Sequence, residues 1–114
     1  PLLFDFHLFD LLAALKDVLA RVPDAGIEMS VEAVSITDKI SYILARLETV
    51  DSLLFADLFE GNSSKAQVIA TFLALLELMK NRIVRAVQVE QFGAIRLMKA
   101  VTDEVLPQTG RLFG

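Results

Sequence analysis

A change of hydrophobic period near Arg82 constrains the fold of this chain more than any other feature. Residues 65–81 carry apolar side chains at spacings of three and four, which is typical of a helix. The stretches "RIVRAVQVE" and "AIRLMK" then alternate apolar and polar residues around a tight "QFG" turn, which predicts a β-hairpin. The sequence therefore predicts a mainly helical α+β fold with a small β-hairpin.

The helix predicted over residues 65–81 has a clear start signal. Ser64 and Gln67 have the spacing of a capping box, and Gly61 and Asn62 turn the chain just before it. Two apolar stripes run along this helix, so it needs cover on more than one side. One stripe consists of Val68, Phe72, Leu75 and Met79, and the other of Ile69, Leu73, Leu76 and Lys80.

Three further elements are expected before that helix. Thr37 is expected to cap a helix that runs to about residue 49. Its buried stripe would be Ile40, Ile43, Leu44 and Leu47. Residues 53–55 are expected to be extended, and residues 56–59 to form a short helical turn. Together with the longer helix and the hairpin, this order predicts a winged-helix domain over residues 37–100.

An amphipathic helix is predicted over residues 2–22, ahead of the winged helix. One apolar row holds Phe4, Leu8, Leu11, Leu15, Val18 and Val22. A second row includes Leu2, Phe6, Phe9 and Ala13, which we expect to meet a partner, a neighbouring segment or a second copy of the chain. Residues 27–36 alternate like a short strand or an extended linker, and the tail, residues 101–114, is expected to be loosely ordered.

Composition indicates one ordinary globular domain. The 114 residues are 54% hydrophobic, enough for a core, and the absence of cysteine excludes disulfides, thiolate metal sites and thiol nucleophiles. The chain starts at Pro1 without a signal-peptide pattern, so we expect a domain of a longer protein. The longest apolar run, residues 68–76, is far shorter than the roughly 20 residues of a membrane helix, and no membrane contact is expected.

Charge is unevenly distributed along the chain. Residues 1–63 hold four basic and eleven acidic residues, whereas residues 64–114 hold seven basic and four acidic ones. This bias is weaker than the clustered positive charge of a dedicated nucleic-acid binder. A DNA-binding winged-helix transcriptional regulator is nevertheless an alternative. If the chain is not such a regulator, no direct sequence-specific DNA binding is expected. The residues that favour this alternative are Arg82, Arg85, Arg96 and Lys99.

No catalytic, cofactor or metal site is expected, and the chain is not predicted to be an enzyme. His7 is the only histidine, and it shares no helical face with Asp5. Helix capping explains Ser63 and Ser64 without catalysis. The stretch "GNSSK" lacks the spacing of a phosphate-binding loop.

Several blocks of the sequence, in their order, resemble one family. The blocks "FADLFEG", "TFLALLEL" and "VQVEQFGAIRL" are similar to the C-terminal winged-helix domain of the segregation and condensation protein A (ScpA) family, the bacterial kleisins. The preceding "VSITDKISYILARL" resembles the first helix of that domain, and "FDFHLFDLLAALKDVLARV" resembles the segment upstream. The resemblance covers nearly all of residues 4–97. Ala94 departs from it, because a polar or acidic residue is expected there.

The resemblance implies a function without chemistry. In that family the kleisin bridges the two heads of a structural-maintenance-of-chromosomes (SMC) ATPase, and its C-terminal winged helix docks on one head. The middle region binds a dimer of segregation and condensation protein B (ScpB). Residues 1–36 would be the end of that region, most of which lies outside this chain. Chromosome condensation and segregation in the cytoplasm, at the nucleoid, is the implied role.

Docking on a protein would explain why residues 65–81 are so apolar. One stripe could face the domain core while other residues contact the SMC head. The alternative is a helix that its own domain buries on all sides. The expected head-contact residues are Ala70, Leu73, Ala74, Glu77, Arg85, Phe92, Ile95 and Leu97. An exposed hairpin edge could also add to a sheet of the head.

Overall fold

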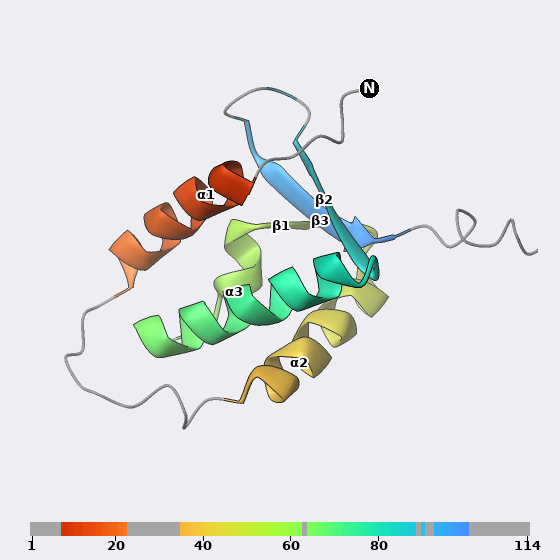
Figure 1. The fold of residues 1–114 in the computed structure, drawn as a ribbon, viewed down its shortest axis with the longest axis horizontal. Coiled ribbons are helices and arrows are strands. Elements are labelled where there is room, and N and C mark those ends of the chain that lie inside the picture. The colour runs from red at the N-terminus through yellow and green to blue at the C-terminus, as the bar shows by residue number, and fades with distance from the viewer. Residues whose placement is uncertain (1–7, 23–34, 63, 89, 91–92, 101–114) are drawn as a thin grey trace, which may run out of the picture.

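Three helices pack around one small antiparallel sheet in the computed structural model, which describes residues 8–22, 35–62, 64–88, 90 and 93–100 (Figure 1). The expected α+β class is confirmed. In chain order the elements are α1 (Leu8–Arg21), α2 (Ile36–Thr49), β1 (Leu53–Leu54), the 3-10 helix η2 (Ala56–Phe59), α3 (Lys65–Lys80), β2 (Val84–Gln88) and β3 (Ile95–Lys99). None of the described helices is long and apolar enough to span a membrane.

Serine side chains begin both α2 and α3. The Ser64 hydroxyl accepts a hydrogen bond from the Gln67 amide at 3.2 Å, which confirms the predicted start of α3. At α2 the prediction was wrong by two residues, because Ser35 rather than Thr37 is the cap. Ser35 has extended backbone angles, and its hydroxyl accepts from the Asp38 amide at 3.1 Å, so Thr37 already lies in the first helical turn.

The end of α3 turns the chain into the sheet. Arg82 takes a left-handed backbone conformation with a φ of 63°. Its amide donates to the carbonyl of Met79 at 3.0 Å, and the amide of Ile83 donates to the carbonyl of Leu78 at 2.9 Å. This pair of bonds is a Schellman motif, which satisfies carbonyl groups at the helix end. The change of period at Arg82 is thus a helix stop followed directly by β2.

The sheet has the strand order β1–β3–β2, with both pairings antiparallel. The hairpin register pairs Val84 with Lys99 and Gln88 with Ile95, so its connection spans residues 89–94. Within this connection the amide of Gly93 donates to the carbonyl of Glu90 at 2.8 Å, which closes a tight turn where the sequence predicted one. β1 pairs with the far side of β3, through Leu53 opposite Leu97.

The core lies between the sheet, η2 and the helices. Figure 1 shows α2 and α3 lying side by side, and these two helices are in extensive contact. Three phenylalanine rings meet in this core: the centroid of Phe55 is 4.9 Å from that of Phe59 and 6.4 Å from that of Phe72. Fully buried side chains from every layer surround them, including Ile43, Leu58, Leu75 and Leu97.

Helix α1 shares this core. Leu11 and Val18 on its inner face are buried in the same cluster as the three phenylalanines. The Lys65 ammonium at the start of α3 donates to the carbonyl of Leu19 at 2.9 Å, so it partners a carbonyl near the C-terminal end of α1. The predictions for residues 2–7, the extended segment at 27–34 and the tail at 101–114 lie outside the described residues.

Candidate partner-binding surface

Helix α3 is buried on most of its circumference and exposed along one row. Its buried residues are Val68, Ala70, Thr71, Phe72, Ala74, Leu75 and Leu78. The exposed row, which we call the α3 row, consists of Ile69, Leu73, Glu77 and Lys80. Ile69 is 37% exposed and Leu73 is 42% exposed. Large aliphatic side chains at a spacing of four therefore face away from the core, whereas Leu76, which belongs to the same predicted stripe, packs against the core.

Half of the predicted contact residues on α3 point outward and half do not. Leu73 and Glu77 are exposed, as expected. The outward placement of Ala70 and Ala74 was wrong, because both are fully buried. The helical twist carries them about 100° around the axis from Ile69 and Leu73, onto the side that faces the core. Their small side chains gave no hydrophobic signal strong enough to reveal this.

Two of the predicted hairpin contacts also belong to the core. Ile95 is 7% exposed and Leu97 is fully buried, so their outward placement was wrong. Side chains alternate along a strand, and both residues share the inner face of the sheet with Val84 and Ala86. Phe92 lies outside the described residues.

Arg85 is exposed, but it lies on a different side of the domain from Leu73. Its neighbours Val84 and Ala86 are buried under the helices, so the side chain of Arg85 points to the opposite, outer face of the sheet. The structure therefore brings Leu73 and Glu77 together and separates Arg85 from them. Ile69, which the predicted contact set omitted, lies one helical turn before Leu73, and its place in the second stripe was the signal for it.

A second apolar surface lies on the outer side of α1. Phe9 is 79% exposed and Ala13 is also exposed, as predicted for the second row of this helix. Leu8 and Leu12 are exposed beside them. Leu8 was expected on the same row as Leu11, but it is 53% exposed whereas Leu11 is buried. Leu2 and Phe6, the other predicted members, lie outside the described residues.

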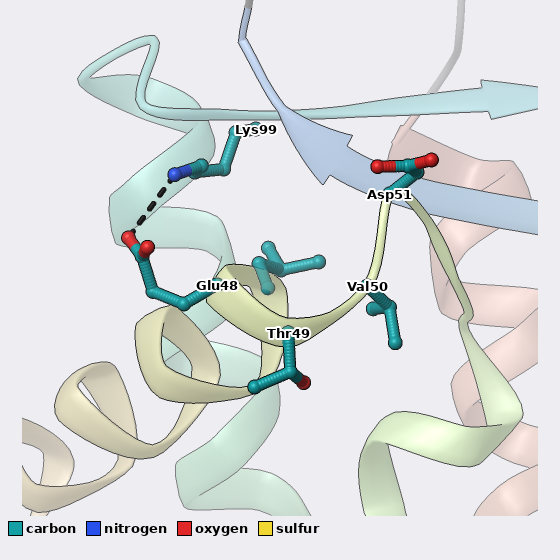
Figure 2. Close-up of a pocket in the computed structure, with 6 residues that line it drawn as sticks. Glu48, Thr49, Val50, Asp51 and Lys99 are labelled. Carbon is teal, nitrogen blue, oxygen red and sulfur yellow. Dashed lines mark hydrogen bonds and ion pairs between the residues drawn. The ribbon is translucent and has the colours of Figure 1, made fainter.

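A hollow of about 630 Å³ lies at the C-terminal end of α2, between residues 47–51 and Lys99 (Figure 2). Lys99 donates to the carboxylate of Glu48 at 3.0 Å and so ties the end of β3 to α2. Figure 2 shows the Asp51 carboxylate apart from this pair, so the two carboxylates do not converge on one point. The hollow thus presents a solvated ion pair and no nucleophile with an adjacent base.

The polar residues that were considered as catalytic or metal-binding candidates either have a structural role or lie outside the described residues. Ser64 caps α3, whereas His7, Asp5 and Ser63 fall in the segments that the structure does not describe. Across residues 8–22, 35–62, 64–88, 90 and 93–100, no three acidic, histidine or cysteine side chains gather as metal ligands. Among the described residues, the candidate binding surfaces are therefore the two exposed apolar ones, the α3 row and the outer side of α1.

Comparison with known proteins matches nearly the whole chain to one family. The family model described as segregation and condensation protein ScpA matches residues 2–99. A relative from Myxococcus xanthus is 37% identical over 97 residues, which cover 82% of this chain and 34% of the relative. A relative from Lactococcus lactis subsp. lactis is 34% identical over 107 residues, covering 90% and 44%. Both relatives are named segregation and condensation protein A.

A third relative of that name, from Xylella fastidiosa, is 37% identical over 94 residues, covering 82% of this chain and 31% of the relative. The chain spans less than half the length of each of these three relatives. The extent of the family match and the level of identity agree with the sequence resemblance described above. The chain belongs to the ScpA family, the bacterial kleisins of chromosome segregation and condensation.

Proposed function

We propose that this chain is part of a non-catalytic kleisin subunit and that its α3 row docks on an SMC ATPase head. The observation that carries this proposal is the exposure of Ile69 and Leu73 on a helix whose other large apolar side chains are buried or half-buried. Complete burial of an aliphatic side chain contributes about 1.5–3 kcal/mol, so these two residues can supply the apolar centre of an interface.

Charged residues extend the α3 row at its C-terminal end. Glu77 and Lys80 are both exposed, one and two turns beyond Leu73. Charges at the rim of an interface fix its orientation and suppress wrong partners more than they add affinity. We therefore assign Leu73 and Ile69 as anchors, and Glu77 as an orienting contact.

Other residues of the expected contact set have different roles in this proposal. Ala70, Ala74, Ile95 and Leu97 support the row from the core, and Phe92 stays a candidate contact on the hairpin. β2 is an edge strand, with no second strand beside it among those the structure describes. Addition of a strand of the head to this edge is a further proposed contact.

The outer row of α1 supports a second association. Phe9 and Ala13 are exposed on this helix, and Leu2 and Phe6 continue the row in sequence. We propose that this row meets either a ScpB dimer, bound mainly through residues upstream of the chain, or a second copy of residues 2–22. The proposed place of action is the nucleoid in the cytoplasm, and ATP hydrolysis belongs to the SMC partner.

A transcriptional regulator is less consistent with the surface of α3. Reading a base sequence requires Arg, Lys, Asn or Gln side chains that reach base edges. The centre of the α3 row presents Ile69 and Leu73 instead. Of the basic residues that favoured this alternative, Lys99 is paired with Glu48.

Calorimetric titration of the chain with the isolated head of its SMC partner tests the docking proposal. Leu73→Arg is expected to weaken binding by about 2 kcal/mol or more, roughly 30-fold, because a charge replaces an apolar anchor. Val50→Arg is the matched control, since Val50 is 41% exposed at the end of α2. Equal binding by Leu73→Arg and the unmodified chain, or an equal loss in Val50→Arg, would contradict the proposal.

A further inference from the structure

The outer side of the β2–β3 hairpin presents two arginines on one surface. Arg85 is paired with Met98, and Val87 with Arg96, so these four side chains point to the same side of the sheet. We call them the outer sheet face. Arg85 and Arg96 are diagonal neighbours on it, and residues in such diagonal pairs lie about 7–8 Å apart.

The outer sheet face is open to solvent. Arg85 and Arg96 are exposed and Val87 and Met98 are half-buried, whereas the inner face of both strands is buried under the helices. Within the described part of the chain, the Arg85 guanidinium has no hydrogen bond or ion pair, whereas its backbone pairs with Met98 in the sheet. Arg96 donates to the neutral hydroxyl of Ser52 at 3.0 Å, a contact that orients the guanidinium without cancelling its charge.

The surrounding charge is positive. Residues 80–100 contain five basic residues and one acidic residue, although the whole chain has a net charge of −4. That acidic residue, Glu90, lines an open hollow of about 270 Å³ with Val87 and Arg96. Lys99 lies on the inner side, where Glu48 balances it. The uncompensated charge of the hairpin therefore lies with Arg85 and Arg96.

The chemistry of this face favours a phosphate backbone. Guanidinium groups bind phosphate in a bidentate manner, so two of them on one open face suit a row of phosphates. Val87 and Met98, between the arginines, have no side-chain groups that read bases by hydrogen bonds. Because phosphates repeat along DNA, two guanidinium groups can bind them at many positions along the duplex. A specific acidic protein would instead need a surface of complementary shape.

We propose that the outer sheet face is a sequence-nonspecific binding site for the phosphate backbone of duplex DNA, with Arg85 and Arg96 as the contact residues. It lies on the side of the sheet away from α3, so it does not use the α3 row. The proposal does not depend on docking to an SMC head, and failure of either proposal leaves the other intact.

Fluorescence anisotropy with a labelled duplex of about 30 base pairs, between about 50 and 200 mM salt, tests this proposal. The double variant Arg85→Glu with Arg96→Glu is expected to raise the dissociation constant at least tenfold and to reduce the salt slope by about 2. The matched control is Lys16→Glu with Arg21→Glu, which makes the same change of net charge at exposed positions of α1. It is expected to change the dissociation constant less than threefold, with both double variants checked for folding by circular dichroism.

A second variant tests the same proposal without changing either arginine. Glu90→Gln removes the carboxylate beside Arg96 and is expected to tighten DNA binding about two- to threefold. No binding by the unmodified chain at about 50 mM salt, or equal losses in the two double variants, would overturn the proposal. So would displacement of the DNA by polyglutamate at an equal charge concentration, because the face would then suit an acidic protein.

Discussion

Arg82 is the residue at which α3 ends, and its conformation costs free energy. A φ of 63° lies in the left-handed region, where the Cβ of a non-glycine residue crowds the following carbonyl. Glycine is the usual residue at this position of a Schellman motif. The motif holds here because both of its hydrogen bonds form, from the Arg82 and Ile83 amides.

Replacing Arg82 with glycine should therefore stabilise the chain. We expect Arg82→Gly to raise the free energy of unfolding by about 0.5–1 kcal/mol, since relief of the left-handed strain outweighs the extra freedom of the unfolded chain. Urea denaturation measures this change. Arg82→Ala, the control, removes the charge but keeps the Cβ and should not stabilise. Equal stabilities for the two variants would contradict the strain argument.

At the scale of the elements, the two sides of α1 have different environments. Leu11 is 2% exposed in the common core, whereas the adjacent Leu12 is 40% exposed on the outer side. The bond from Lys65 to the Leu19 carbonyl adds a polar contact between α1 and α3. α1 is thus expected to contribute to the stability of the domain through one side and to remain available on the other.

A pair of identical substitutions on α1 tests this assignment. Leu11→Ala is expected to lower the free energy of unfolding by about 2–4 kcal/mol, because it leaves a cavity in the core. Leu12→Ala, on the exposed side, should change it by about 0.5 kcal/mol or less. Thermal or urea unfolding gives both values, and similar losses for the two variants would show that α1 is not packed as described.

Several features of the fold could be predicted from local patterns in the sequence. The cap at Ser64, the change of period at Arg82 and the apolar stripe through Ile69 and Leu73 all follow from spacings within a few residues. The pairing of β1 with β3 was not predicted, because two residues carry no detectable period. The Glu48–Lys99 contact joins residues that are distant in sequence, and no local pattern reports it.

The candidate surface was predicted only in part, for a related reason. Alternation and helical spacing show which residues share a face, but not which face the rest of the molecule covers. Leu73 and Glu77 are exposed, as a contact requires, whereas Ile95 and Leu97 were expected among the contacts although their strand face packs under the helices. Only the tertiary arrangement decides between the two sides of a hairpin.

For the whole molecule, the fold separates two surfaces of different chemistry. The α3 row is aliphatic at its centre, with Ile69 and Leu73 facing away from the core. The outer sheet face is cationic, and the core lies between the sheet and α3. Under the two proposals made above, a protein head would use the first of these surfaces and a DNA backbone the second.

The measurement that tests docking through the α3 row most directly is a methyl NMR titration of the chain with its SMC head. We expect the methyl signals of Ile69 and Leu73 to shift or broaden as the head binds. The methyls of Ile36 and Val50, exposed at the two ends of α2, should remain unchanged. Binding of the head with unchanged Ile69 and Leu73 signals would contradict the account, because the head would then dock on another surface.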